Sequence, residues 1–428
     1  FQGDRSITFS ELDAGAERFA WALRSRGVGS GASVGLHMER SVDWVIGMLG
    51  ILKAHSAVVP LPPAYPIGRL QEILDFAELD AIVDGPETPL DPALGVTGLR
   101  IPEPSSAIDA DVPALAGDPD QPAFVLCSSG STGRPKMIVR SHRSFFHRLR
   151  WTWEKHPFEE GEVGCQKAHM TTTHSIYELF EPLLMGAPGV IIPDQDVRNL
   201  ERFWDIVRDR GVSRLLIVPS ALRASLDMPG FSPPPLEVLV LMGEYVDPVL
   251  AERTLAAFSA STRTYSIYGS TEASSTLVCD LRESLRPGEE LPLGTPISSD
   301  VDALVLGPDL APVAAGESGR LYMTGTALFT GYLGDPTLTA SVFVDVPGHR
   351  DPLYDTQDEV RAMPDGGLEF VGRADHTVKI RGFRVDLLEV ERTMLLHPEI
   401  SQAAVVVSES DSGTATLVAF YAPASVEI

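Results

Sequence analysis

The sequence has few cysteines and no long apolar run, and each shortage excludes a class of protein. Its three cysteines, Cys127, Cys165 and Cys279, are widely spaced and odd in number, so they indicate neither a disulfide framework nor a zinc cluster. No stretch reaches the roughly 18 consecutive apolar residues that a membrane-spanning helix needs. The start, "FQGDRSITFS", lacks the basic and apolar regions of a signal peptide. These features favour a reducing, cytoplasmic location.

Basic residues are also scarce. The 428-residue chain carries 34 Lys and Arg against 59 Asp and Glu, a formal net charge of −25. Nucleic acids and anionic membranes bind clustered basic residues, so we expect neither as a main partner. Only five of the basic residues are lysines, which makes the position of each lysine informative. The length predicts two or three domains.

Apolar periodicity predicts an α/β protein. Early in the chain a helix pattern, with Ser10 as its predicted N-cap and Gly27 as its stop, precedes an apolar strand at 33–38. Helix and strand patterns go on alternating up to residue 85 and again over 189–270, which predicts parallel sheets covered by helices. We interpret residues 85–122, rich in Pro, Asp and Ala, as a surface connection.

The pattern changes in the last third of the chain. After about residue 292, short strand patterns follow one another with Gly and Pro between them, which predicts a small β-rich subdomain. From Asp375 the start of another small α/β unit follows. We therefore predict a large core of mixed or parallel sheets over 1–374 and an incomplete C-terminal unit over 375–428. Both ends look cut, so we expect a fragment of a longer protein.

A loop of small residues stands out between Phe124 and His142, "FVLCSSGSTGRPKMIVRSH". Its many N–H groups and hydroxyls, closed by the charge of Lys136, suit a polyphosphate. The spacing is not that of a Walker loop, because Met137 follows the lysine and no glycine precedes it. A P-loop NTPase or kinase is therefore disfavoured. Taken alone, the segment favours a plainer interpretation, a polar turn between a strand and a helix.

Six other segments stand in a fixed order around this loop and carry a resemblance. The seven are "LKAHSAVVPLPPAYP" (52–66), "SSGSTGRPK" (128–136), "HMTTTHSIYELFEPLLMGA" (169–187), "YSIYGSTEAS" (265–274), "GRLYMTGTALFTGYLGDP" (319–336), "YDTQDEV" (354–360) and "GRADHTVKIRGFRVDLLEVE" (372–391). Together they resemble the adenylate-forming superfamily of acyl-CoA synthetases, luciferases and adenylation domains, and most of all the adenylation domains of nonribosomal peptide synthetases, which make antibiotics and similar products.

The resemblance implies a two-step ligase reaction. A small carboxylic acid attacks the α-phosphate of ATP, with Mg²⁺, to give an acyl-adenylate and pyrophosphate, and a thiol then takes the acyl group. The segments 52–66 and 379–391 favour the phosphopantetheine thiol of a carrier protein over free CoA. An acyl-CoA ligase or carboxylate-reductase adenylation domain is the first alternative. The second is a non-catalytic, nucleotide-binding relic inside an assembly line.

The resemblance also assigns the ATP site. The positions that it places against ATP are Ser128, Ser129, Gly130, Ser131, Thr132, Gly133, Gly243, Glu244, Tyr268, Gly269, Ser270, Asp358 and Arg373. Tyr268 is expected to stack on adenine, and Asp358 and Arg373 to contact the ribose hydroxyls. The plainer alternatives are a core aromatic for Tyr268 and a surface ion pair for Arg373.

Three further positions are implied to act on the phosphates. Lys136 neutralises the leaving pyrophosphate, Thr271 contacts phosphate, and Glu272 holds Mg²⁺, a cation that takes one or two carboxylates together with phosphate oxygens. Charge neutralisation and positioning are the main needs of such a transfer. Asp375 matches the hinge between the large domain and a C-terminal lid. The plainer alternative for Glu272 is a solvated loop carboxylate.

The chain departs from the family pattern at three places. Met137 stands where most members have Gly, and "YDTQD" at 354–358 replaces the usual Tyr-Arg-Thr-Gly-Asp. The family's adenylation lysine comes late in the lid, yet no lysine follows Lys379. We expect a chain truncated before that lysine, able to bind ATP but poor at adenylation.

The acid pocket is implied by matching "SIYELF" to the family pattern. This places Thr173 where amino-acid activators carry an Asp that pairs with the substrate ammonium. The other matched positions are His174, Tyr177, Ile217, Val240, Met242, Ile267, Ser275 and Thr276. None is acidic, and an unpaired buried ammonium costs several kcal/mol. We therefore predict a hydroxy, keto, aryl or other non-standard acid. His174 suits a second hydroxyl or anionic group, or is a core histidine.

Overall fold

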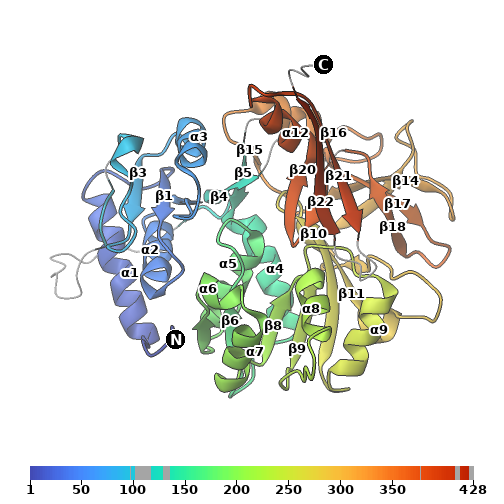
Figure 1. Cartoon of the computed structure of the whole chain (residues 1–428), viewed down its shortest axis with the longest axis horizontal. Helices are drawn as coiled ribbons and strands as arrows, with labels where there is room; N and C mark the ends of the chain where they lie inside the picture. Colours follow the sequence, from blue (N-terminus) through green and yellow to red (C-terminus); the bar gives the residue numbers. More distant parts are fainter. Residues whose placement is uncertain (97, 102–116, 129–134, 376, 410–414, 424–428) are drawn as a thin grey trace.

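The computed structural model describes residues 1–428 except 97, 102–116, 129–134, 376, 410–414 and 424–428. Figure 1 shows an N-terminal block of helices and strands, a middle block beside it, and the C-terminal strands lying above the middle block. Mixed sheets covered by helices make up the two larger blocks, as the alternating pattern predicts. The α/β fold class is confirmed.

The first sheet has six strands in the order β15-β5-β4-β2-β1-β3. Its elements and the helices beside them are α1 (Phe9–Arg24), β1 (Ser33–His37), α2 (Val42–Lys53), β2 (Ala57–Pro60), α3 (Ile67–Ala77), β3 (Ala81–Asp84), η1 (Pro92–Leu94), β4 (Pro122–Ser128), β5 (Lys136–Ser141) and β15 (Gly331–Tyr332). Strands β1 to β4 pair in parallel, whereas β5 pairs antiparallel with β4 and β15. The predicted connection at 85–122 contributes η1.

The Gly-Ser-Thr segment joins β4 to β5, so it connects two antiparallel strands and not a strand and a helix. Ser128 ends β4 and pairs with Lys136, the first residue of β5. The predicted phosphate-binding positions Ser129, Gly130, Ser131, Thr132 and Gly133 lie outside the described residues.

The second sheet has five strands in the order β12-β11-β10-β9-β8. The elements of this block are α4 (His142–Lys155), β6 (Gly164–Gln166), α5 (Thr173–Leu184), β7 (Gly189–Ile191), α6 (Asp194–Val197), α7 (Leu200–Asp209), β8 (Arg214–Ile217), α8 (Pro219–Leu226), β9 (Val238–Met242), α9 (Pro248–Ala257), β10 (Arg263–Ser270), β11 (Ser274–Asp280), α10 (Leu281–Ser284) and β12 (Thr295–Pro296). Strands β8, β9 and β10 are parallel, and β11 and β12 turn antiparallel. Strand β10 ends where the candidate site begins.

The predicted β-rich subdomain is a third, antiparallel sheet, and a smaller unit follows it. The elements are β13 (Asp302–Leu306), β14 (Ser318–Thr324), α11 (Pro336–Val342), β16 (Phe343–Val344), β17 (Leu353–Ala362) and β18 (Leu368–Arg373), then β19 (Thr377–Ile380), β20 (Phe383–Asp386), α12 (Leu387–Leu395), β21 (Ile400–Glu409) and β22 (Ala415–Pro423). We call β19 to β22 with α12 the lid. Its β19–β20 hairpin lies on the middle block (Figure 1).

Helix α1 begins two residues before the predicted N-cap. Thr8, not Ser10, accepts a hydrogen bond from the amide of Glu11, and the Glu11 carboxylate accepts one from the Thr8 amide in return. This reciprocal capping box satisfies two donors that a helix end leaves free. Ser10 and Asp13 share the same spacing in the sequence, so the pattern alone pointed to the wrong pair.

Replacement of the cap tests this correction. We expect Thr8→Ala to lower the free energy of unfolding by about 1 kcal/mol, because the helix loses its side-chain cap. Ser10→Ala, the matched control, should change it by less than about 0.5 kcal/mol. Urea unfolding of both variants checks this, and a larger loss for Ser10→Ala would contradict the assignment.

Candidate functional site

A sharp bend at the end of β10 turns an acidic side chain inward. The β10–β11 register shifts between Tyr268 and Gly269, and a Cβ placed on Gly269 would lie 1.8 Å from the carbonyl oxygen of Ser274. Only glycine fits there. The chain then turns so that Glu272 is 2% exposed. The motif glycine therefore serves to bury the carboxylate that follows it.

The buried carboxylate of Glu272 is paired with a cation from the lid. Arg384 of β20 places its Nη1 3.2 Å from Glu272 Oε1, and the hydroxyl of Tyr332 donates to the same oxygen at 3.3 Å. The Lys136 ammonium lies 5.9 Å from the centre of the Tyr332 ring. Burial and the nearby Arg384 charge lower the pKa of Lys136. Lys136 and Glu272 are thus brought together as predicted, whereas Arg384 and Tyr332 went unrecognised in the sequence.

A second charged group lies at the start of the lid. Arg373 pairs with Asp358 and donates two hydrogen bonds of 2.7 Å to Asp375, which also faces Arg384 at 3.2 Å. Burial alone would raise the pKa of Asp375, but its bonds to Arg373 and the charges beside it lower the pKa far below its usual value. The Tyr268 hydroxyl donates to Asp358, and burial followed by that carboxylate raises the pKa of Tyr268.

Glu244 fixes the tip of the lid hairpin. Its carboxylate accepts hydrogen bonds from the amide of Gly382 at 2.7 Å and from the amide and hydroxyl of Ser220 at 2.7 and 3.0 Å. Gly382 has a φ of +79°, and a Cβ there would lie 2.6 Å from Val218 Cγ1, so the close approach requires glycine. Glu244, predicted on the adenine side, here joins the lid to the core.

The predicted nucleotide residues surround one cavity. A space of about 440 Å³ is lined by Gly243, Tyr268, Asp358 and Arg373, together with Lys379 of the lid. The Lys379 ammonium donates to the carbonyl oxygen of Gly269 at 3.2 Å, and burial lowers its pKa. A carboxylate and a guanidinium facing one cavity suit the hydroxyls of a ribose.

A second cavity of about 240 Å³ adjoins it and contains part of the predicted acid pocket. Of the predicted positions, Thr173, His174 and Met242 line this cavity, next to Ser128 and Thr271. Other predicted positions lie elsewhere. Ile217 lines a third cavity and Ile267 lines the nucleotide cavity, whereas Tyr177, Val240, Ser275 and Thr276 are buried and line none of these three cavities.

His174 stands between the second and the third cavity and lines both. Its ring packs on Gly243, where a Cβ would lie 2.9 Å from His174 Cε1. Burial, helped by the positive charges of Lys167 and Lys379, lowers the pKa of His174 to about 3. His174 is therefore neutral at physiological pH. The third cavity, of about 300 Å³, is also lined by the exposed Arg198 and Arg381.

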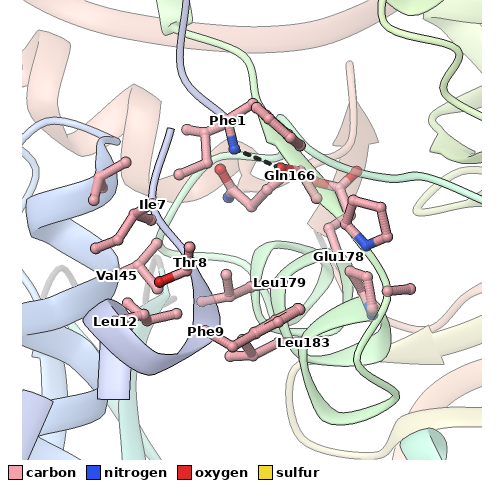
Figure 2. Close-up of a pocket in the computed structure, with 16 residues that line it drawn as sticks. Phe1, Ile7, Thr8, Phe9, Leu12, Val45, Gln166, Glu178, Leu179 and Leu183 are labelled. Carbon is pink, nitrogen blue, oxygen red and sulfur yellow. Dashed lines mark hydrogen bonds between the residues drawn. The ribbon is translucent and has the colours of Figure 1, made fainter. Parts of the chain in front are cut away.

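A fourth cavity lies away from these charged groups. Figure 2 shows it between the start of α1 and helix α5, with Ile7, Leu12, Leu179 and Leu183 around it. Its volume is about 300 Å³, and the ammonium of Phe1 donates to Gly189 at its edge. Of the predicted site residues that the structure describes, none lines this cavity. Its apolar lining offers no chemistry for phosphate transfer.

Two further features limit the possible functions. Among the helices of the described residues, none is long and apolar enough to cross a membrane. Over the same part of the chain, no three His, Cys, Asp or Glu side chains come together as a metal cluster. Glu272 is thus a single buried carboxylate, which fits a Mg²⁺ that takes its remaining ligands from phosphate and water.

Comparisons with known proteins agree with this geometry. The family described as "AMP-binding enzyme" matches residues 1–333. The chain is 33% identical to one component of the mycosubtilin synthase of Bacillus subtilis and to the malpinin synthetase of Mortierella alpina, each over 98% of its length. It spans only 16% and 5% of those proteins.

A solved structure shows the same fold. NpsA-ThdA, an artificially fused adenylation-PCP di-domain from Klebsiella oxytoca, superposes with a TM-score of 0.85 and 27% identity, covering 100% of this chain and 85% of that one. PA1221, which contains adenylation and PCP domains, gives 0.83 over 96% of this chain and 71% of its own, at 23% identity, and supports the fold alone.

The depressed pKa of His174 predicts a pH-dependent stability. Its folded pKa of about 3 lies below its ordinary 6.5, so the unfolded chain binds the proton first as the pH falls. His174 therefore lowers stability progressively from about pH 6.5 down towards pH 3, and has no such effect above this window. We expect His174→Asn to lose less stability than the wild type between pH 7 and pH 5, measured by urea unfolding. Equal losses would contradict a buried, neutral His174.

Proposed function

Because this chain belongs to the family of AMP-binding enzymes, we propose that it joins a carboxylic acid to AMP with release of pyrophosphate, for transfer to a carrier-protein thiol. One observation carries the proposal. Gly243 and Lys379 line both the nucleotide cavity and the acid cavity. The carboxylate of an acid in one cavity and the α-phosphate of a nucleotide in the other therefore meet at these two residues.

The nucleotide residues divide the work by charge. Asp358 and Arg373 hold the ribose, Tyr268 closes the adenine side, and Lys136 neutralises phosphate charge. Glu272 shares a divalent cation with the phosphates, and that cation supplies charge neutralisation. Arg384 now occupies Glu272, and two cations repel at this distance in a buried site. Arg384 therefore leaves Glu272 when Mg²⁺ binds there, which requires the lid hairpin to move.

The acid is not an ordinary α-amino acid. Besides the matched position Thr173, two acids of α5 are near enough to be considered as partners for an ammonium. Both are already neutralised: Glu178 accepts from the amides of Lys167 and Ala168 at 2.7 and 2.6 Å, and Glu181 pairs with Arg148 at 2.9 Å. An ammonium would enter without a carboxylate, at a cost of several kcal/mol.

The third cavity offers a route for the acceptor thiol. It opens beside Arg198 and Arg381 and shares His174 and Gly382 with the acid cavity. Two guanidinium groups at the mouth suit the phosphate of a phosphopantetheine arm, and the shared residues bring its thiol to the acyl carbon. CoA carries the same arm, so an acyl-CoA ligase remains the alternative. Transfer to a holo-carrier protein compared with CoA separates them.

Charge removal at Glu272 tests the cation site. We expect Glu272→Gln to lose the Mg²⁺ dependence of ATP binding, because an amide keeps the shape of the carboxylate without its charge. Titration calorimetry with and without Mg²⁺ measures this, and Glu289→Gln, at an exposed position, serves as control. Equal Mg²⁺ dependence in the wild type and Glu272→Gln would refute the assignment.

Acid-dependent exchange of pyrophosphate into ATP tests the reaction itself. The chain lacks a lysine after Lys379, so we expect slow exchange that depends on the added acid and that Lys136→Ala slows a further 10²- to 10³-fold or so. A panel of amino, hydroxy, keto and aryl acids measures this. ATP binding without exchange for any acid would favour a nucleotide-binding relic, and no ATP binding would refute both functions.

A further inference from the structure

The floor of the acid cavity is closed by packed side chains. Met242 lines the cavity, and it packs in one buried cluster with Val240, Ile267 and Trp151 of α4. Trp151 is 7% exposed and meets the ring of Tyr265 edge-on at 5.8 Å. Interiors of this kind have few voids larger than a water molecule. A substrate cannot extend past Met242 without displacing the indole beneath it.

The side wall below Thr173 is closed as well. The hydroxyl of Tyr177 bonds to that of Ser274, and its ring stacks on Phe145 at 6.0 Å. The Arg148 guanidinium lies 5.7 Å from the same ring and 4.7 Å from that of Trp151. The predicted position Tyr177 is therefore a wall and not a subsite. An aryl ring or a long acyl chain has no space on this side.

The lining that remains is polar and carries no negative charge. Hydroxyls come from Thr171, Thr172, Thr173 and Ser270, and the imidazole of His174 is neutral. The charged residues that line the cavity are Arg69, Lys379 and Arg384; no Asp or Glu among the described residues does so. The cations repel an ammonium, while hydroxyl side chains and a neutral imidazole both donate to and accept from a hydroxyl.

We propose that this cavity takes a short, uncharged, hydroxylated acid, a 2-hydroxy acid of the glycolate or lactate class. The volume limits its length to about two to four carbons, since about 240 Å³ lies below the roughly 300–1,000 Å³ of sites for drug-sized ligands. The inference rests on the proposed function, which supplies the AMP half of the ligand. Of the hydroxy, keto and aryl acids that the sequence allows, it selects the first.

Non-reactive analogues test this without relying on turnover. Four compounds are titrated by calorimetry: 5′-O-sulfamoyladenosine and its N-lactoyl, N-alanyl and N-hexanoyl derivatives. We expect the lactoyl compound to bind at least about tenfold more tightly than the alanyl compound, since the hydroxyl finds partners and the ammonium does not. The hexanoyl compound should bind more weakly than the lactoyl compound, because its chain meets Met242.

The four titrations separate two failures. If none of the compounds binds, the proposed function fails and the inference with it. If unacylated sulfamoyladenosine binds, the nucleotide site stands. Alanyl or hexanoyl binding as tight as lactoyl binding would then overturn the inference while leaving the proposed function intact.

Two variants locate the cause. Met242→Ala should raise affinity for the hexanoyl compound by about tenfold, because it opens the floor; Met323→Ala, an equally buried methionine in the third sheet, should leave all four affinities unchanged. Thr173→Asp should raise affinity for the alanyl compound by roughly tenfold or more through a charged hydrogen bond. Thr173→Asp gives an independent result if Met242→Ala fails to fold. No gain for either ligand would show that these side chains do not limit the cavity.

Discussion

A buried carboxylate must have a cationic partner, and in this protein the need falls on Glu272. At 2% exposure, its charge alone would cost several kcal/mol. The bend at Gly269 buries it, Tyr332 of the first sheet donates to it, and Arg384 of the lid neutralises it. Elements separated by more than a hundred residues therefore meet at one oxygen pair. The position of the lid follows from this pairing together with the bond between Glu244 and Gly382.

The sequence predicted which motif residues gather, but not what holds them. Lys136, Glu272, Asp358, Arg373 and Asp375 were assigned to one site, and the structure places them around adjoining cavities. Ordered motifs suffice for this because the family spacing encodes the fold. The partners Arg384, Tyr332 and Ser220 were missed, because a contact between distant segments leaves no periodic signal in a single chain.

The acid pocket shows the limit of matching positions one by one. Thr173, His174 and Met242 line the predicted cavity, yet Tyr177 and Val240 are packed away from it. The residues that close it, Trp151 and Arg148 of α4, come from a helix that no motif marks. Packing decides how deep a pocket is, and packing depends on all neighbours at once. Helix ends have a similar ambiguity, since Thr8 and Ser10 are equally good caps on paper.

The central claim is that the Glu272 carboxylate serves one cation at a time, Arg384 or Mg²⁺. Hydrogen exchange of the hairpin 377–386 tests it most directly, because the Gly382 amide is held by Glu244 only while the lid is in this position. The account predicts faster exchange in this hairpin when ATP and Mg²⁺ are added together than with either alone. Unchanged or slower exchange while nucleotide and Mg²⁺ are both bound would contradict it.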